Sequence, residues 1–275
     1  MTAQNSVAGF LAPRAVGRAA IVAGRLLVVV LLGALLSACL SLGEDGPSRA
    51  DAGVGSGQAA QPGAQPGAQP AAGKTSPRWT AEAIDTTAGA DYLGETEKEL
   101  VLEINRLRTD PAAYAASYLE PLRRYYRGNL LQYPGEIAIQ TTEGARALDE
   151  CIRVLEATPG VSTLAPRKGL CLAARDQARD QARSGRTGHT GSDGSTVPDR
   201  LNRYGKWSLS AGENIDYGNA AARRIVISFL VDDGVPSRGH RGNLLDPSFH
   251  LVGVAVGPHP TYGRMCVLDF AGAYR

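Results

Sequence analysis

The stretch "HLVGVAVGPHPTYGRMCVLDFAG", residues 250–272, decides the fold class. It contains two runs with the composition of β-strands, "HLVGVAVG" and "RMCVLDFAG". They are separated by "PHPTYG", whose prolines and glycine favour a turn. The stretch therefore predicts an antiparallel hairpin. Because helical patterns precede it, the sequence predicts an α+β fold in which helices cover a small sheet.

The helices upstream are indicated by their caps and by apolar residues at helical spacing. "TEKE", Thr96 to Glu99, has the form of a capping box and predicts a helix start. Asp110 is expected to cap a second helix, with Pro111 in its first turn. Further helices are predicted over three ranges: 142–156, 169–184 (ended by Gly185) and 219–233.

An apolar run, "LLVVVLLGALLSA", occupies residues 26–38 directly after Arg25. It is shorter than the roughly 20 residues that a membrane-spanning helix needs. A charged start, an apolar centre and a small-residue end are typical of an export signal. The run continues into "LSAC", Leu36 to Cys39, which resembles a bacterial lipobox. We expect a lipoprotein signal peptide over 1–38 and a lipid on Cys39. A plain secretory signal with a chance cysteine and a single anchor helix are the alternatives.

The segment after this signal is predicted to be a linker over 39–92. It includes "QPGAQPGAQPAAG" and has almost no bulky apolar residues between 40 and 78. Such a composition cannot bury enough surface to offset its ordering entropy. We therefore expect a tether between the membrane and a folded domain over 93–275.

Charge is unevenly distributed, although the whole chain carries a net charge of only +2. The first 38 residues hold three arginines and no acid, which leaves 26 basic and 27 acidic residues in the remainder. Without a basic field, nucleic-acid binding is disfavoured. With the signal, this predicts a bacterial cell-envelope protein that is lipid-anchored and extracytoplasmic, or secreted if Cys39 is not modified.

Three cysteines follow the signal: Cys151, Cys171 and Cys266. Because three is odd, they form at most one disulfide among themselves. A Cys151–Cys171 bond would close a short loop between two predicted helices. Alternatively, the thiols pack as small free hydrophobic groups.

The candidate site consists of two histidines and two acids. His189 in "TGHTG" and His240 in "RGHRG" each lie in a glycine-framed loop after a predicted helix. Glycine permits positive φ or close backbone approach, so the loops can present the imidazoles. Glu213 lies in "SAGENID", and Asp232 ends the last predicted helix. Neutral imidazoles bind divalent transition metals, and carboxylates either join them or orient their second nitrogen.

Three neighbours are expected to support the His240 loop. Arg238 and Arg241 flank the histidine, and their charge would favour a neutral imidazole, which suits metal binding. Asn243 is expected to tie the loop through side-chain hydrogen bonds to its backbone.

Spacing alone favours ordinary loop histidines, since the chain has no compact H-x-x-x-H pair. The remaining histidines, His250 and His259, lie beside or within the predicted hairpin. They are predicted to be structural or surface residues.

The order of the motifs along the chain, by contrast, favours a functional role for His189 and His240. "SRGHRGNLLDPSFHLVGVAVG", preceded by "GHTGSDGS" and "AGENI", resembles the CAP superfamily of cysteine-rich secretory proteins, antigen 5 and pathogenesis-related 1 proteins. "NRLRTDPAAY" is similar to the bacterial, SCP-like branch. The resemblance covers about residues 95–275. It implies an α-β-α sandwich with a small central antiparallel sheet and a cleft lined by two histidines and two acids.

By this resemblance His189 and His240 are the cleft histidines, and Glu213 is the acid of the "GEN" motif. Many members carry a glutamate three residues after an aromatic residue. Here Phe229 is followed by Asp232, which is one methylene shorter. The resemblance implies that His189 and His240 bind a divalent metal, for which zinc is expected.

Members of the family are described as binding sterols, other lipids or metal ions, and protease activity has been proposed for some. The sequence therefore favours a binding module with a metal cleft, for which a lipid, another apolar molecule or a peptide is the expected ligand. A metal-assisted hydrolase with Glu213 as general base is one alternative. A structural or adhesive surface domain is the other.

The lipobox pattern predicts that the mature protein begins at a lipidated Cys39 and partitions into detergent. Cys39→Ser should leave the chain unprocessed or release it from the membrane. Mass spectrometry of the mature N-terminus tests this, and a cleaved, soluble product with an unmodified cysteine would contradict it.

Overall fold

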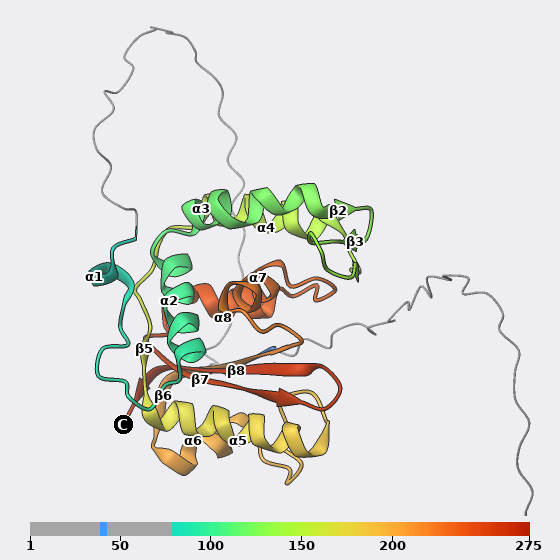
Figure 1. The fold of residues 1–275 in the computed structure, drawn as a ribbon. Helices are drawn as coiled ribbons and strands as arrows, with labels where there is room; N and C mark the ends of the chain where they lie inside the picture. The colour runs from blue at the N-terminus through green and yellow to red at the C-terminus, as the bar shows by residue number, and fades with distance from the viewer. Residues whose placement is uncertain (1–38, 43–78) are drawn as a thin grey trace, which may run out of the picture. The chain divides into compact units, whose positions relative to one another are not determined.

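The computed structural model describes residues 39–42 and 79–275. The predicted signal peptide and residues 43–78 of the predicted linker lie outside the described residues. Helices cover both faces of the central sheet (Figure 1), which confirms the predicted α-β-α sandwich. Helices α5 (Lys168–Ser184) and α6 (Val197–Tyr204) lie on one face. The other face is covered by α2 (Glu95–Thr109), α7 (Ala222–Val231) and α8 (Gly239–Leu245).

The central sheet has the strand order β1-β6-β8-β7-β5. The predicted hairpin is β7 (Leu251–His259) and β8 (Gly263–Tyr274), paired antiparallel. β6 (Trp207–Tyr217) pairs antiparallel with the other side of β8. The short strands β1 (Cys39–Leu42) and β5 (Ala165–Pro166) complete the sheet, antiparallel to β6 and parallel to β7 respectively.

Alternation along the strands assigns side chains to the two faces. Ala211 and Ile215 of β6 pack with apolar residues of α5, so Glu213 between them faces α5 as well. Asn214 and Asp216 face the side of α7 and α8. α5 lies very close to β7, because a Cβ added to Gly253 would be 2.2 Å from the carbonyl carbon of Leu170.

A second layer of short elements lies beyond α2. It comprises α3 (Pro111–Tyr114), the π-helix η1 (Ala115–Leu119), the 3-10 helix η2 (Glu120–Tyr125), α4 (Ala145–Ala157) and a three-stranded sheet of β2 (Tyr126–Arg127), β3 (Leu130–Leu131) and β4 (Ile139–Gln140). Asp110 caps α3 as predicted, since its Oδ1 accepts from the amide of Ala113 at 2.9 Å. The capping box expected at Thr96 is wrong. The N-cap of α2 is Gly94, two residues before Thr96, and the Glu97 carboxylate accepts from the amide of Gly94 at 2.9 Å.

Arg108 of α2 is fully buried and joins distant parts of the chain. Its guanidinium donates to the carbonyl oxygens of Ser162, Leu244, Asp246 and Phe249, at 2.7 to 3.1 Å. Burial lowers the pKa of this arginine to about 10. The hydrogen bonds fix the end of α8 and the start of β7 relative to α2.

Both bounds of the predicted linker, residues 39–92, differ from the structure. Trp79 stacks on Tyr118 with ring centroids 5.9 Å apart, and Ile84 of α1 (Ala81–Ile84) is buried. Asn105 donates to the carbonyl oxygen of Ile84 at 2.9 Å. Residues 79–92 are therefore part of the domain. At the other end, residues 39–42 form β1 rather than linker.

The three cysteines of the domain are free and buried. The alternative of a Cys151–Cys171 disulfide is therefore wrong, and the thiols pack as small apolar groups. Burial raises the pKa of Cys151 to about 12 and that of Cys171 to about 11. In the part of the chain that the structure describes, no helix is long and apolar enough to cross a membrane.

The contacts of residues 79–92 predict that a fragment of residues 79–275 is substantially more stable than one of residues 93–275. The shorter fragment loses the burial of Ile84, worth about 1.5–3 kcal/mol. It also leaves the buried amide of Asn105 short of acceptors, which costs about 1–3 kcal/mol. Urea unfolding of both fragments measures the difference. Equal midpoints would show that residues 79–92 do not contribute to the folded domain.

Candidate functional site

His189 is held by a buried carboxylate. It follows Gly188, which has a φ of +98° in the loop after α5, as the glycine pattern predicted. The Nδ1 atom of His189 lies 2.6 Å from Oε1 of Glu213 on β6, and Glu213 is fully buried. Because a carboxylate accepts hydrogen bonds, it fixes the neutral imidazole with its proton on Nδ1. The Nε2 atom of His189 is buried and has no hydrogen-bond partner.

Glu213 is fully engaged on its second oxygen as well. Arg200 of α6 donates from Nη2 to Glu213 Oε2 at 2.7 Å, and its Nη1 donates to the carbonyl oxygen of His189 at 3.0 Å. The arginine therefore neutralises the acid and holds the backbone of the histidine. A general base must accept a proton from substrate or water, and Glu213 has both oxygens occupied. This geometry argues against the expected general-base role of Glu213.

His240 forms a second histidine–carboxylate pair. Its Nδ1 atom lies 2.6 Å from Oδ1 of Asp232, and its amide donates to Oδ2 of the same residue at 3.1 Å. Both side chains are buried, and Phe229 of α7 stacks on the imidazole with centroids 5.4 Å apart. The shorter acid therefore reaches its histidine, because Asp232 ends α7 in a left-handed conformation with a φ of +52°.

The expected glycine-rich loop around His240 is wrong. Gly239 to Leu245 form α8, and His240 lies in its first turn. Positive φ occurs in the turn before α8, at Asp232 (+52°), Gly234 (+77°) and Arg238 (+50°), rather than at the glycines that flank the histidine. In the turn between α7 and α8, the side-chain contacts of Asp232 and Arg238 offset the energetic cost of this backbone conformation.

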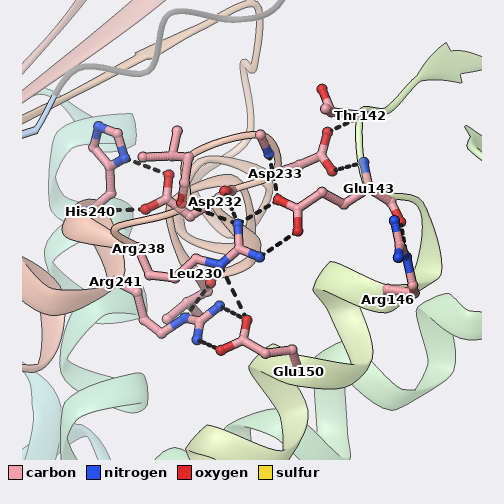
Figure 2. A network of polar contacts seen from close by, with 12 residues as sticks. Thr142, Glu143, Arg146, Glu150, Leu230, Asp232, Asp233, Arg238, His240 and Arg241 are labelled. Atoms are coloured by element: carbon pink, nitrogen blue, oxygen red, sulfur yellow. Dashed lines mark hydrogen bonds and ion pairs between the residues drawn. The ribbon is translucent and has the colours of Figure 1, made fainter.

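Those contacts are shown in Figure 2. The guanidinium of Arg238 points to Glu143, with both nitrogen–oxygen distances at 2.7 Å, and Arg241 forms a similar pair with Glu150, at 2.7 and 2.8 Å. Each arginine charge is therefore balanced by a glutamate. With their charges balanced, the arginines act mechanically rather than by holding His240 neutral: they tie the His240 turn to Glu143, just before α4, and to Glu150 of α4.

The two histidine–carboxylate pairs are connected through β6. Asn214 Nδ2 donates to the carbonyl oxygen of His240 at 3.0 Å, and Asn243 donates to Asn214 Oδ1 at 2.8 Å. Asn243 of α8 thus supports the site through a side-chain hydrogen bond to Asn214 of β6. Since Glu213 and Asn214 are consecutive, they support the two pairs from opposite faces of the sheet. Among the residues described, no group of three or more His, Cys, Asp or Glu side chains could hold a metal ion.

Sequence analysis missed three polar residues of this region: Arg200, Asp216 and Asp269. Asp216 faces the side of α7, accepts from Asn219, and has its pKa raised to about 7 by burial. Asp269 of β8 lies opposite Glu213 in the strand register. The alternation in "GENID" is the signal that could have placed Asp216 beside Asn214, had a strand been predicted there.

The other two histidines have structural or surface positions, as predicted. His259 is buried, and its Nδ1 accepts from the amides of Thr261 and Tyr262, at 3.2 and 3.4 Å. Its Nε2 therefore carries the proton and donates to the carbonyl oxygen of Arg186 at 3.1 Å. His250 is exposed.

A cavity of about 330 Å³ lies along α5 beside the loop that follows His189. Charged side chains dominate its lining, which includes Asp176, Arg179, Asp180, Arg183, Asp193 and Arg203. Arg203 is paired with Asp176 and Asp193, at 2.9 Å each. Such a lining does not suit an apolar ligand.

Comparison with known proteins agrees with this architecture. Residues 103–270, more than half of the chain, match the model of the CAP family, the cysteine-rich secretory protein family. The chain belongs to this family. No curated protein matches it.

Two solved structures are similar to parts of the chain. One is an extracellular protein containing an SCP domain from Bacillus anthracis, with 26% identity and a TM-score of 0.33 over 45% of this chain and 37% of that one. The other is an outer surface protein from Borrelia burgdorferi, with 20% identity and a TM-score of 0.35 over 40% of this chain and 78% of that one. The match thus spans little more than a third of the Bacillus protein.

The ion pairs at the His240 turn predict a pH-dependent effect of Glu143→Gln. Hydrogen bonds from Arg238 lower the pKa of Glu143 to about 2, below its ordinary value. Its contribution to stability is therefore present above about pH 4.3 and is lost as the pH falls toward 2. Because Glu143 is partly exposed, we expect a loss of about 1 kcal/mol at pH 7.

Urea unfolding at pH 7 and at pH 3 measures this loss, which should be smaller at pH 3. Glu136→Gln is the matched control, because Glu136 also pairs with an arginine, Arg224, but is half exposed. If the control loses as much stability as Glu143→Gln, the Glu143–Arg238 ion pair stabilises the domain no more than an exposed ion pair does.

Proposed function

We propose that this chain is an extracytoplasmic binding module in which His189 and His240, on opposite faces of the sheet, each offer a ligand to a divalent metal ion, for which zinc is the first candidate. The observation that carries the proposal is the pair of buried histidine–carboxylate contacts, each 2.6 Å long and each made through Nδ1. Carboxylates that fix Nδ1 leave the Nε2 lone pair of a neutral imidazole as the metal ligand. The partnerless Nε2 of His189 fits this role.

The donor set also suggests the strength of binding. A single imidazole at each pair supplies fewer ligands than the four of a closed structural zinc site, so the ion would be exchangeable and would keep water or ligand atoms in its shell. A peptide or lipid group with an oxygen donor could occupy that position. This supports a binding module over a hydrolase, since the Glu213 oxygens already accept hydrogen bonds from His189 and Arg200.

The place of action in this proposal is the cell envelope. The matching Bacillus and Borrelia structures are described as extracellular and outer surface proteins. The lipobox pattern at Cys39 adds a lipid anchor to the membrane. An adhesive or structural surface domain, by contrast, would not need either histidine.

Calorimetric titration of zinc into the wild type, His189→Ala and His240→Ala tests the metal site. We expect each substitution to abolish zinc binding at its own pair and leave the fold intact by circular dichroism. Affinity of the wild type should fall on acidification, because protons compete for the imidazoles.

His250→Ala is the matched control, since it removes an exposed histidine that lies outside both pairs, and it should bind zinc like the wild type. If both site variants also bind like the wild type, the proposal fails. If a purified site variant is unfolded, Asp232→Asn takes its place in the titration. This substitution keeps the imidazole of His240 but weakens its support, so zinc should bind more weakly.

A further inference from the structure

Unpartnered polar atoms gather around Glu213. Among the residues described, six buried side-chain nitrogen or oxygen atoms have no hydrogen-bond partner. Four of them are His189 Nε2, Arg200 Nε and the two carboxyl oxygens of Asp269. All three residues surround the carboxylate of Glu213. Buried polar groups are normally paired, so this concentration needs a physical explanation.

Asp269 is the most unusual member of the group. It is fully buried at the centre of the sheet, opposite Glu213 on β6 and opposite Gly253 on β7. The backbone of Leu170 on α5 lies directly above Gly253 and closes this face. Neither oxygen of Asp269 accepts a hydrogen bond from a donor group. An ionised carboxylate in such a place would be very costly.

The neighbour of Asp269 is another carboxyl group. Two carboxylates repel each other, but a carboxylic acid and a carboxylate can form a short, strong hydrogen bond if they share one proton. Glu213 is the better anion of the two, because Arg200 and His189 both hydrogen-bond to it. The proton therefore belongs on Asp269.

We propose that Asp269 is a neutral carboxylic acid that donates its proton to Glu213 and is an unassigned positioning residue of the His189 site. Glu213 then receives support from Arg200 on α6 and from Asp269 on β8, while its Oε1 remains directed at His189. This inference does not depend on metal binding.

The charged surroundings agree with this assignment. Burial, followed by the charge of Glu213, raises the pKa of Asp269 well above its ordinary value, and Arg200 only partly opposes the shift. α5 contributes apolar residues to this face, among them Leu170, Ala173 and Ala174. Further along β8, the hydroxyl of Tyr274 donates to the carbonyl oxygen of Leu201.

The proposal predicts a distinctive pH dependence of folding. Between the ordinary aspartate pKa of about 4 and the raised value in the folded protein, the folded state binds one proton that the unfolded state does not. The contribution of Asp269 is complete below about pH 4 and is lost as the pH rises. The unfolding constant of the wild type should therefore increase about tenfold per pH unit relative to that of Asp269→Asn.

Urea unfolding of the whole mature chain at pH 5, 6 and 7 measures this ratio. The asparagine retains an N–H donor toward Glu213 but cannot ionise, so it removes the linked proton. Asp193→Asn is the matched control, because Asp193 is exposed and its pKa is lowered to about 2, so its ratio should be flat over this range. A flat ratio for Asp269→Asn would overturn the proposal.

Infrared spectroscopy of the wild type keeps the proposal testable if Asp269→Asn does not fold. At pH 8.5 or so, above the pKa of about 7 for Asp216, the folded protein should still show a carboxylic-acid carbonyl band. Absence of that band would mean that Asp269 is ionised, and the proposal would fail. When the variant does fold, nitrogen NMR should find the His189 proton still on Nδ1, because the amide replaces the acid as donor.

Discussion

The buried guanidinium of Arg108 is the interaction on which the arrangement of the domain depends. A charged group at this depth is tolerated only when its donors are satisfied, and four backbone carbonyl oxygens satisfy it. Two of them belong to Leu244 and Asp246, at the end of the helix that carries His240. A third belongs to Phe249, just before β7. One side chain from α2 therefore sets the distance between the helical layer and the sheet, and with it the position of one half of the candidate site.

The other half depends on β6, and the two halves are built in the same way. In each, a buried acid accepts a hydrogen bond from Nδ1 of a histidine, and arginines stabilise the surroundings. Arg200 binds Glu213 directly, while Arg238 binds Glu143, just before α4, and Arg241 binds Glu150 of α4. The difference lies in what holds the acid. Glu213 stands on a strand in the middle of a polar cluster, whereas Asp232 stands at a helix end beside Phe229.

Local sequence patterns were sufficient to predict the hairpin, the α3 cap and most helices, because strong β-formers, caps and helical spacing act over a few residues. They did not predict β6, because Glu213, Asn214 and Asp216 are poor strand formers that are stabilised by contacts with residues distant in sequence, among them Arg200 and His240. They also placed Arg238 and Arg241 correctly beside His240. They assigned these arginines the wrong role, because their ion-pair partners, Glu143 and Glu150, lie about 90 residues away in sequence. The role of Asp269 could not be predicted, because it depends on Glu213, which lies opposite it in the sheet. The four site residues themselves were predicted from motif order, which carries information that spacing lacks.

The three buried thiols have a consequence for where the domain can be made. Small exported domains often require disulfides and therefore an oxidising compartment for folding. Here Cys151, Cys171 and Cys266 fill space in the core as unreacted groups, and burial keeps them protonated and unreactive. The architecture is thus redox-neutral. The fold of the described domain therefore does not depend on an oxidising compartment.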